Sequence, residues 1–128
     1  MSNSAALRIA AVLGFLAVAL GAFGAHGLKD LLARNNTAAI WEKAVFYHFI
    51  HALGMLAVPL LIRAGLISEP AGAWTGWLLL AGIVLFSGSL YLLAITGMRT
   101  LGAITPFGGV SFIAAWVVLA VCALRSGS

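Results

Sequence analysis

Four long apolar runs, separated by short polar segments, make up most of the chain. They cover about residues 7–25, 41–62, 74–95 and 107–124. A helix rises about 1.5 Å per residue, so roughly 20 apolar residues cross the hydrocarbon core of a bilayer. The pattern predicts four transmembrane helices. Because the connections are short, we expect an all-α, antiparallel four-helix bundle that forms a single domain over residues 1–128.

A short amphipathic segment joins the first two runs, at about residues 27–34. Its leucines share one helical face, while Lys29, Asp30 and Arg34 lie off that face. Such a segment is typical of a helix that lies along the membrane surface. We therefore expect a short interfacial helix between the first and second spans.

Composition supports lipid as the solvent of this chain. Hydrophobic residues account for 63% of the sequence and charged residues for only 8%, against roughly a quarter in ordinary globular domains. The seven basic and three acidic residues lie at or between the apolar runs. The net charge of +4 comes from these flanking positions and forms no basic run or face, which argues against nucleic-acid binding. Four basic residues on one side against three on the other leave the orientation open.

Connectivity places several polar side chains in one half of the bilayer. The end of the first span, the start of the second, the end of the third and the start of the fourth all lie on the same side. This half holds His26, Tyr47, His48, His51, Tyr91 and Thr105. An imidazole in an apolar segment is costly unless it is hydrogen-bonded, protonated or bound to a metal.

Three interpretations of this cluster compete. The histidines could be structural and hydrogen-bonded across helices, with Tyr91 or Ser87 as the partner of His51. A metal ion such as copper or zinc could bind His26, His48 and His51. In an oligomer, His48 and His51 could instead line a path for protons or small solutes.

Catalytic motifs are missing from the sequence. It has no glycine-rich phosphate loop, no Ser/His/Asp set with a buried acid and no paired carboxylates. We therefore expect a non-enzymatic protein with a scaffold, accessory or self-assembling role, and no cofactor other than a possible metal ion. The alternative is an oligomer with a histidine-lined metal-binding or conducting site.

Small residues recur along the predicted helices at spacings that allow close helix–helix approach. In the first span they form a ridge with a spacing of four residues, and glycines are found in the third and fourth spans. The set comprises Ala17, Gly21, Ala25, Gly82, Gly88, Gly108 and Gly109. It offers more close-approach surface than four short helices need internally. Besides the lipid bilayer, we expect as partners further copies of the chain or a larger membrane complex.

Several separated motifs carry a family resemblance. They are GAFGAHGL at residues 21–28, the WxxAxxYHxxHAL pattern at 41–53, and FSGSLY at 86–91 followed by ITPFGG at 104–109. Together they resemble the bacterial YgdD-like membrane proteins, the "domain of unknown function 423" family, whose eukaryotic relative is transmembrane protein 256. The resemblance implies a small four-helix integral membrane protein, most simply of the bacterial inner (plasma) membrane. It implies no activity.

Overall fold

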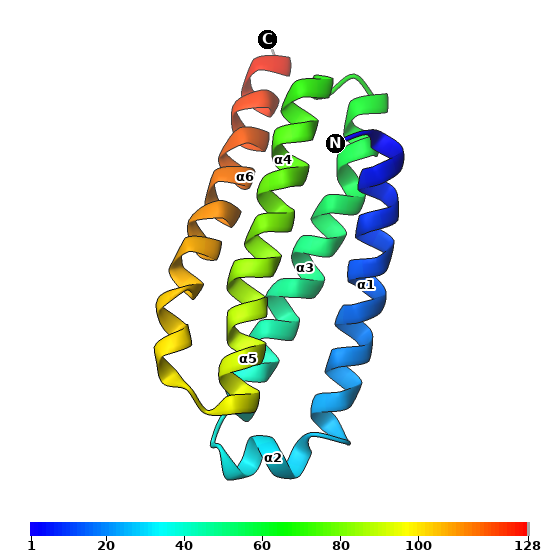
Figure 1. Cartoon of the computed structure of the whole chain (residues 1–128). Helices are drawn as coiled ribbons and strands as arrows, with labels where there is room; N and C mark the ends of the chain where they lie inside the picture. Colours follow the sequence, from blue (N-terminus) through cyan, green and yellow to red (C-terminus); the bar gives the residue numbers. More distant parts are fainter. Residues whose placement is uncertain (128) are drawn as a thin grey trace.

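A computed structural model describes residues 1–127 and contains four long helical segments (Figure 1). Each is long and apolar enough to cross a membrane. They are α1 (Asn3–Ala25), α3 (Ala38–Arg63), the continuous run of α4 (Glu69–Gly82), η1 (Ile83–Ser87) and α5 (Gly88–Thr96), and α6 (Thr105–Ser126). The short helix α2 (Lys29–Arg34) lies at one end, and a 3₁₀ helix, η2 (Arg99–Ala103), leads into α6. The predicted antiparallel four-helix membrane architecture is confirmed.

The third helical segment begins earlier than its apolar run. Helix α4 starts at Glu69 rather than near Trp74, because the hydroxyl of Ser68 accepts a hydrogen bond from the amide of Ala71 at 3.3 Å. Pro70 falls in the first turn, where a helix tolerates a residue that lacks an N–H. The polar start of the helix therefore extends beyond the hydrophobic stretch that predicted it.

A π-helical turn, η1, interrupts the same segment near its middle. The amide of Gly88 bonds the carbonyl of Ile83, five residues earlier, which widens the helix there. Hydrophobic periodicity gave no sign of this turn. Its consequence is local: the hydroxyl of Ser87 donates to the Ala44 carbonyl of α3 at 2.7 Å.

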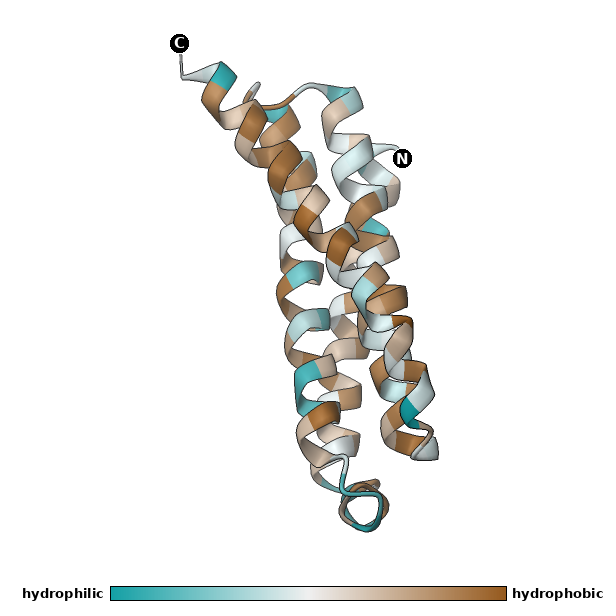
Figure 2. Cartoon of the chain, turned by 90° about the vertical axis from the view of Figure 1, so that its left-hand side faces the viewer, coloured by the Kyte–Doolittle hydropathy of each residue, from teal (hydrophilic) through white to brown (hydrophobic). Residues whose placement is uncertain are grey.

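Helix α3 occupies the centre of the packing. It contacts α1 on one side and α4, η1 and α5 on the other, while α6 packs mainly against α4 and η1. In Figure 1, α1 and α6 accordingly lie at opposite edges of the bundle. Figure 2 shows hydrophobic residues over most of the long helices, with hydrophilic positions at the two ends and in the half nearer α2. Outer faces of α1 and α6 are thus left to lipid.

Glycines allow the closest helix approaches. A Cβ on Gly108 would lie 2.3 Å from the backbone nitrogen of Phe86, so α6 touches η1 backbone to backbone. A Cβ on Gly82 would meet the ring of Phe112 at 2.3 Å, and one on Gly24 the indole of Trp41 at the same distance. These positions exclude any side chain unless a neighbour moves.

Other small residues of the predicted set differ in their surroundings. Ala17 is fully buried, and a Cβ on Gly21 would contact Val45 at 3.4 Å. At Gly109 the nearest neighbour would be Phe86, at an ordinary 3.9 Å. Within residues 1–127, an added Cβ at Gly88 meets nothing within 4 Å.

Ala25, the last residue of α1, is also exposed. Neither Gly88 nor Ala25 therefore serves close packing inside the bundle, and close helix approach at these two positions stays a prediction. Spacing along a helix shows which residues share a face. It does not show which face meets a neighbour.

Gly108→Ala and Gly88→Ala form a matched pair that tests this packing. We expect Gly108→Ala to lower the free energy of unfolding by about 1–3 kcal/mol, because the methyl group meets backbone that cannot move aside. Gly88→Ala should leave stability unchanged or raise it by up to about 1 kcal/mol through helix propensity. Thermal or denaturant unfolding in detergent micelles measures both, and equal losses would contradict the proposed α6–η1 contact.

Candidate functional site

His51 lies at the centre of the polar cluster, halfway along α3 and 5% exposed. Its Nδ1–H donates to the carbonyl of Tyr47 at 2.7 Å, and its Nε2 accepts from the Nε1–H of Trp116 in α6 at 3.1 Å. A carbonyl can only accept and an indole N–H can only donate. The two partners therefore fix the ring as the neutral, Nδ1-protonated tautomer.

Aromatic rings enclose the same imidazole. Phe112 stacks on it with centroids 3.6 Å apart and planes 11° from parallel, and Tyr47 stacks at 5.9 Å. One face of the ring is thus covered by Phe112, and both of its nitrogens are hydrogen-bonded. His51 is therefore a packed, hydrogen-bonded residue that joins α3 to α6.

His48, one turn before His51 and 3% exposed, joins α3 to the third segment instead. Its Nδ1 shares a 2.8 Å hydrogen bond with the hydroxyl of Tyr91 in α5, and the tautomer decides which atom donates. Its Nε2 is buried near the backbone carbonyl of Leu13 in α1, without reaching hydrogen-bond geometry with any atom of residues 1–127. The ring therefore sits where α1, α3 and α5 meet.

Trp41 packs beside this pair and is 2% exposed. Its indole fits over Gly24, and its Nε1–H donates to the carbonyl of Leu20 in α1 at 2.9 Å. The ring of Tyr91 approaches it with centroids 4.7 Å apart. Although a tryptophan near a helix end is often a membrane-interface anchor, this one holds α1 and α5 against α3.

The link between α2 and α3 caps the end of α5. The side-chain amide of Asn35 donates to the carbonyls of Ala94 and Ile95 at 3.1 and 2.9 Å. The hydroxyl of Thr37 donates to Ala94 at 2.7 Å. The last carbonyls of a helix have no partner within that helix, so these bonds satisfy acceptors that lipid could not.

Among the remaining predicted residues, only Tyr47 contacts a buried imidazole, through its ring and through the backbone carbonyl that accepts from His51. His26 is exposed at the C-terminal cap of α1. Tyr47 packs its ring on Phe86, and its hydroxyl makes no hydrogen bond within the described chain. Thr105 does not cap α6, which begins after Ile104; its hydroxyl instead shares a 2.6 Å hydrogen bond with Ser89.

The arrangement does not form a metal centre. Among residues 1–127, no three His, Cys, Asp or Glu side chains come together in a way that could hold a metal ion. His26 is separated from the other two candidates, and the Nε2 of His51 is occupied by Trp116. What the cluster does offer is a set of bonds between neutral groups that connects α3 to α1, η1, α5 and α6.

Sequence reasoning missed three residues of this network: Trp116, Asn35 and Thr37. Trp116 did carry a signal, because it lies in the middle of the fourth span, away from either membrane interface, where an indole N–H needs a partner. Asn35 and Thr37 are residue types that commonly end or cap a helix, which is a local role. Nothing local to them indicates that the acceptors lie in α5, about 60 residues away.

A double-mutant cycle measures the bond between His51 and Trp116. We expect a coupling free energy of about 0.6–1.7 kcal/mol between His51→Phe and Trp116→Phe, the range found for hydrogen bonds between membrane helices. Trp77→Phe is the matched control, since Trp77 is 54% exposed and has no hydrogen bond within the described residues. Unfolding in detergent supplies the four free energies, and zero coupling would contradict the bond.

Comparison with known proteins adds the family. A family model described as "Protein of unknown function (DUF423)" matches residues 20–109. A UPF0382 membrane protein of Staphylococcus epidermidis (strain ATCC 12228 / FDA PCI 1200) is 50% identical over 120 residues, which cover 91% of this chain and 93% of that protein. The UPF0382 membrane protein YwdK of Bacillus subtilis (strain 168) is 48% identical over 118 residues, which cover 91% and 94% of the two chains. No solved structure matches the chain significantly. With its four apolar helices and these bacterial relatives, the chain is an integral membrane protein of the DUF423 family, as its motifs predicted.

Proposed function

We propose that this protein is a non-catalytic membrane scaffold or accessory unit, in which the buried histidines hold the helices together. The observation that carries this proposal is the state of His51, whose two nitrogens are both engaged by groups with fixed donor or acceptor roles. A residue that takes up protons or a metal needs a free nitrogen or a partner that can change its role. His51 has neither.

Purification without a histidine tag, followed by elemental analysis, tests the structural role. We expect only substoichiometric copper, zinc or iron in the wild type. His51→Ala should lower the unfolding free energy by about 1–3 kcal/mol, because it leaves the Trp116 N–H without a partner in surroundings where lipid offers none. A stoichiometric metal that is lost in this variant would contradict the proposal. His26→Ala, at an exposed site, is the control and should leave stability unchanged.

The outer face of α1 supports a role in assembly. Gly14 has no atom of residues 1–127 within 4 Å of an added Cβ, so packing inside the bundle does not require a glycine there. Its neighbours Phe15 and Val18 are 71% and 63% exposed. A glycine costs about 1 kcal/mol relative to alanine in a helix interior, and in membranes it typically permits close contact with another helix. We propose that a helix of a second copy packs across this surface.

Native mass spectrometry from nanodiscs tests the assembly. We expect the wild type to form a homo-oligomer and Gly14→Leu to shift it toward monomer, because the larger side chain blocks close approach. Val12→Leu is the matched control, because Val12 is 57% exposed on another face of α1. If the wild-type protein is monomeric at every protein-to-lipid ratio, self-assembly through this surface is contradicted.

A further inference from the structure

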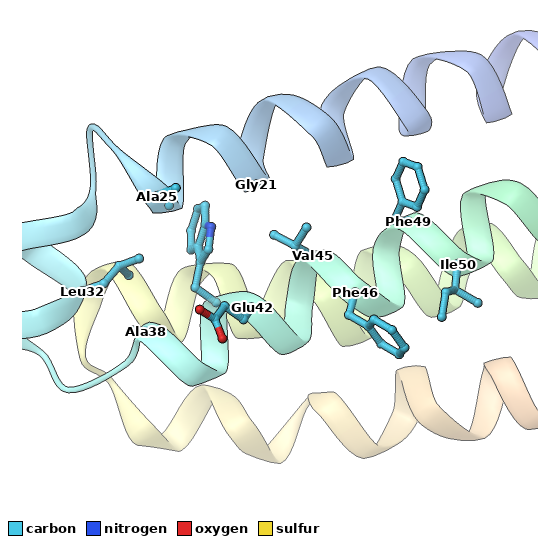
Figure 3. A pocket seen from close by; sticks show the side chains of 11 residues that line it. Gly21, Ala25, Leu32, Ala38, Glu42, Val45, Phe46, Phe49 and Ile50 are labelled. Atoms are coloured by element: carbon cyan, nitrogen blue, oxygen red, sulfur yellow. The ribbon is translucent and has the colours of Figure 1, made fainter.

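An apolar groove runs between α1 and the first half of α3, open to the membrane. Its volume is about 450 Å³. Gly21, Gly24 and Ala25 line it from α1, and Val45, Phe46, Phe49 and Ile50 line it from α3. In Figure 3, Val45 and Phe49 extend from α3 toward α1, while Phe46 and Ile50 extend from α3 away from α1. The absence of side chains at Gly21 and Gly24 lets Val45 and Trp41 of α3 pack closely against α1 beside the groove.

A carboxylate lies at one end of this apolar surface. Glu42 lines the groove and is exposed, and among the groove residues it is the one that carries a charge. It lies about 6 Å along α3 from Ala38, in a helix about 39 Å long. A hydrocarbon core of about 30 Å covers the middle of such a helix, so Glu42 lies at the boundary with the lipid headgroups.

The occupant that suits this surface combines an acyl chain with a cationic headgroup. The apolar walls match a lipid tail lying along the helices, and the carboxylate matches an ammonium group at headgroup depth. Lys43, the next residue along α3, is exposed and supplies a cation for a phosphate. A zwitterionic headgroup satisfies both charges, whereas a headgroup with only negative charge is repelled by Glu42.

We propose that the groove binds one phospholipid whose headgroup carries a primary amine, with the ammonium on Glu42 and an acyl chain between α1 and α3. The groove lies in the leaflet on the α2 side of the bundle. It adjoins the surface around Gly14, because Phe49 lines both, but Gly14 itself lies about 17 Å along α1 from Ala25, toward the other leaflet. Separate variants, at Ala25 and at Gly14, therefore test lipid binding and self-assembly.

The experiment compares two lipids with identical acyl chains, phosphatidylethanolamine and phosphatidylglycerol, titrated onto the full chain in detergent and followed by native mass spectrometry. We expect wild type to bind one phosphatidylethanolamine about two- to fivefold more tightly, the range set by a partly exposed ion pair. Glu42→Gln should remove this preference and retain acyl-chain binding. Glu69→Gln, which removes a carboxylate at the opposite end of the bundle, should keep the preference.

A second pair of variants tests the groove itself. Ala25→Leu fills the groove from α1 and should weaken binding of both lipids, while Ala22→Leu, on a surface that does not line it, should not. Equal affinity of wild type for the two lipids, or an unchanged preference in Glu42→Gln, would overturn the proposal. A dimer that Ala25→Leu dissociates would also overturn it, because the groove would then hold a second copy of the chain.

Discussion

Lipid offers no hydrogen bonds, and this constraint decides where the polar side chains of the bundle lie. Each hydroxyl, imidazole or indole within the spans has to find its partner in another part of the protein. Backbone carbonyls supply most of these partners. Ser87 bonds Ala44, Ser111 bonds Leu78, and Trp41 bonds Leu20, with donor–acceptor distances of 2.6–2.9 Å. Each of these bonds joins two different helices. The same bond therefore satisfies a polar group and fixes the relative position of two helices.

Close backbone approach makes these bonds possible. A hydroxyl reaches the carbonyl of a neighbouring helix only where the helices nearly touch, and the glycines on α1, α4 and α6 allow that. Gly24 admits the indole of Trp41, and Gly108 brings α6 against η1. The π turn at η1 lies at the point where α3, α6 and the third segment converge. Small residues and polar residues thus act together, because neither would stabilise the bundle alone.

Much of the architecture follows from hydropathy. The four spans, the surface helix α2 and the side on which most of the polar groups gather can all be read from apolar runs and connectivity. The hydrogen-bond partners cannot be predicted in this way, because they depend on the rotation of each helix about its axis. His51 bonds Trp116 rather than Tyr91 or Ser87, and Tyr91 bonds His48. Similarly, small-residue spacing predicts close helix approach at both Gly82 and Gly88. Within the described chain, only Gly82 faces a neighbouring side chain.

The interior and the surface of this protein therefore carry different information about its role. Both nitrogens of His51 are hydrogen-bonded, and a protonated His51 could no longer accept from Trp116, whereas the buried Nε2 of His48 has no hydrogen-bond partner among residues 1–127. The state of His51 fits the structural role proposed for it. The outer surface, by contrast, holds features that packing within the described residues does not explain: a half-buried glycine, Gly14, with nothing within 4 Å of an added Cβ, and an apolar groove that ends at Glu42. Selection for a stable bundle alone would remove both, since alanine at the first and a larger side chain in the second would add helix propensity or buried area. The function of this family is therefore to be sought where the bundle meets lipid and other helices.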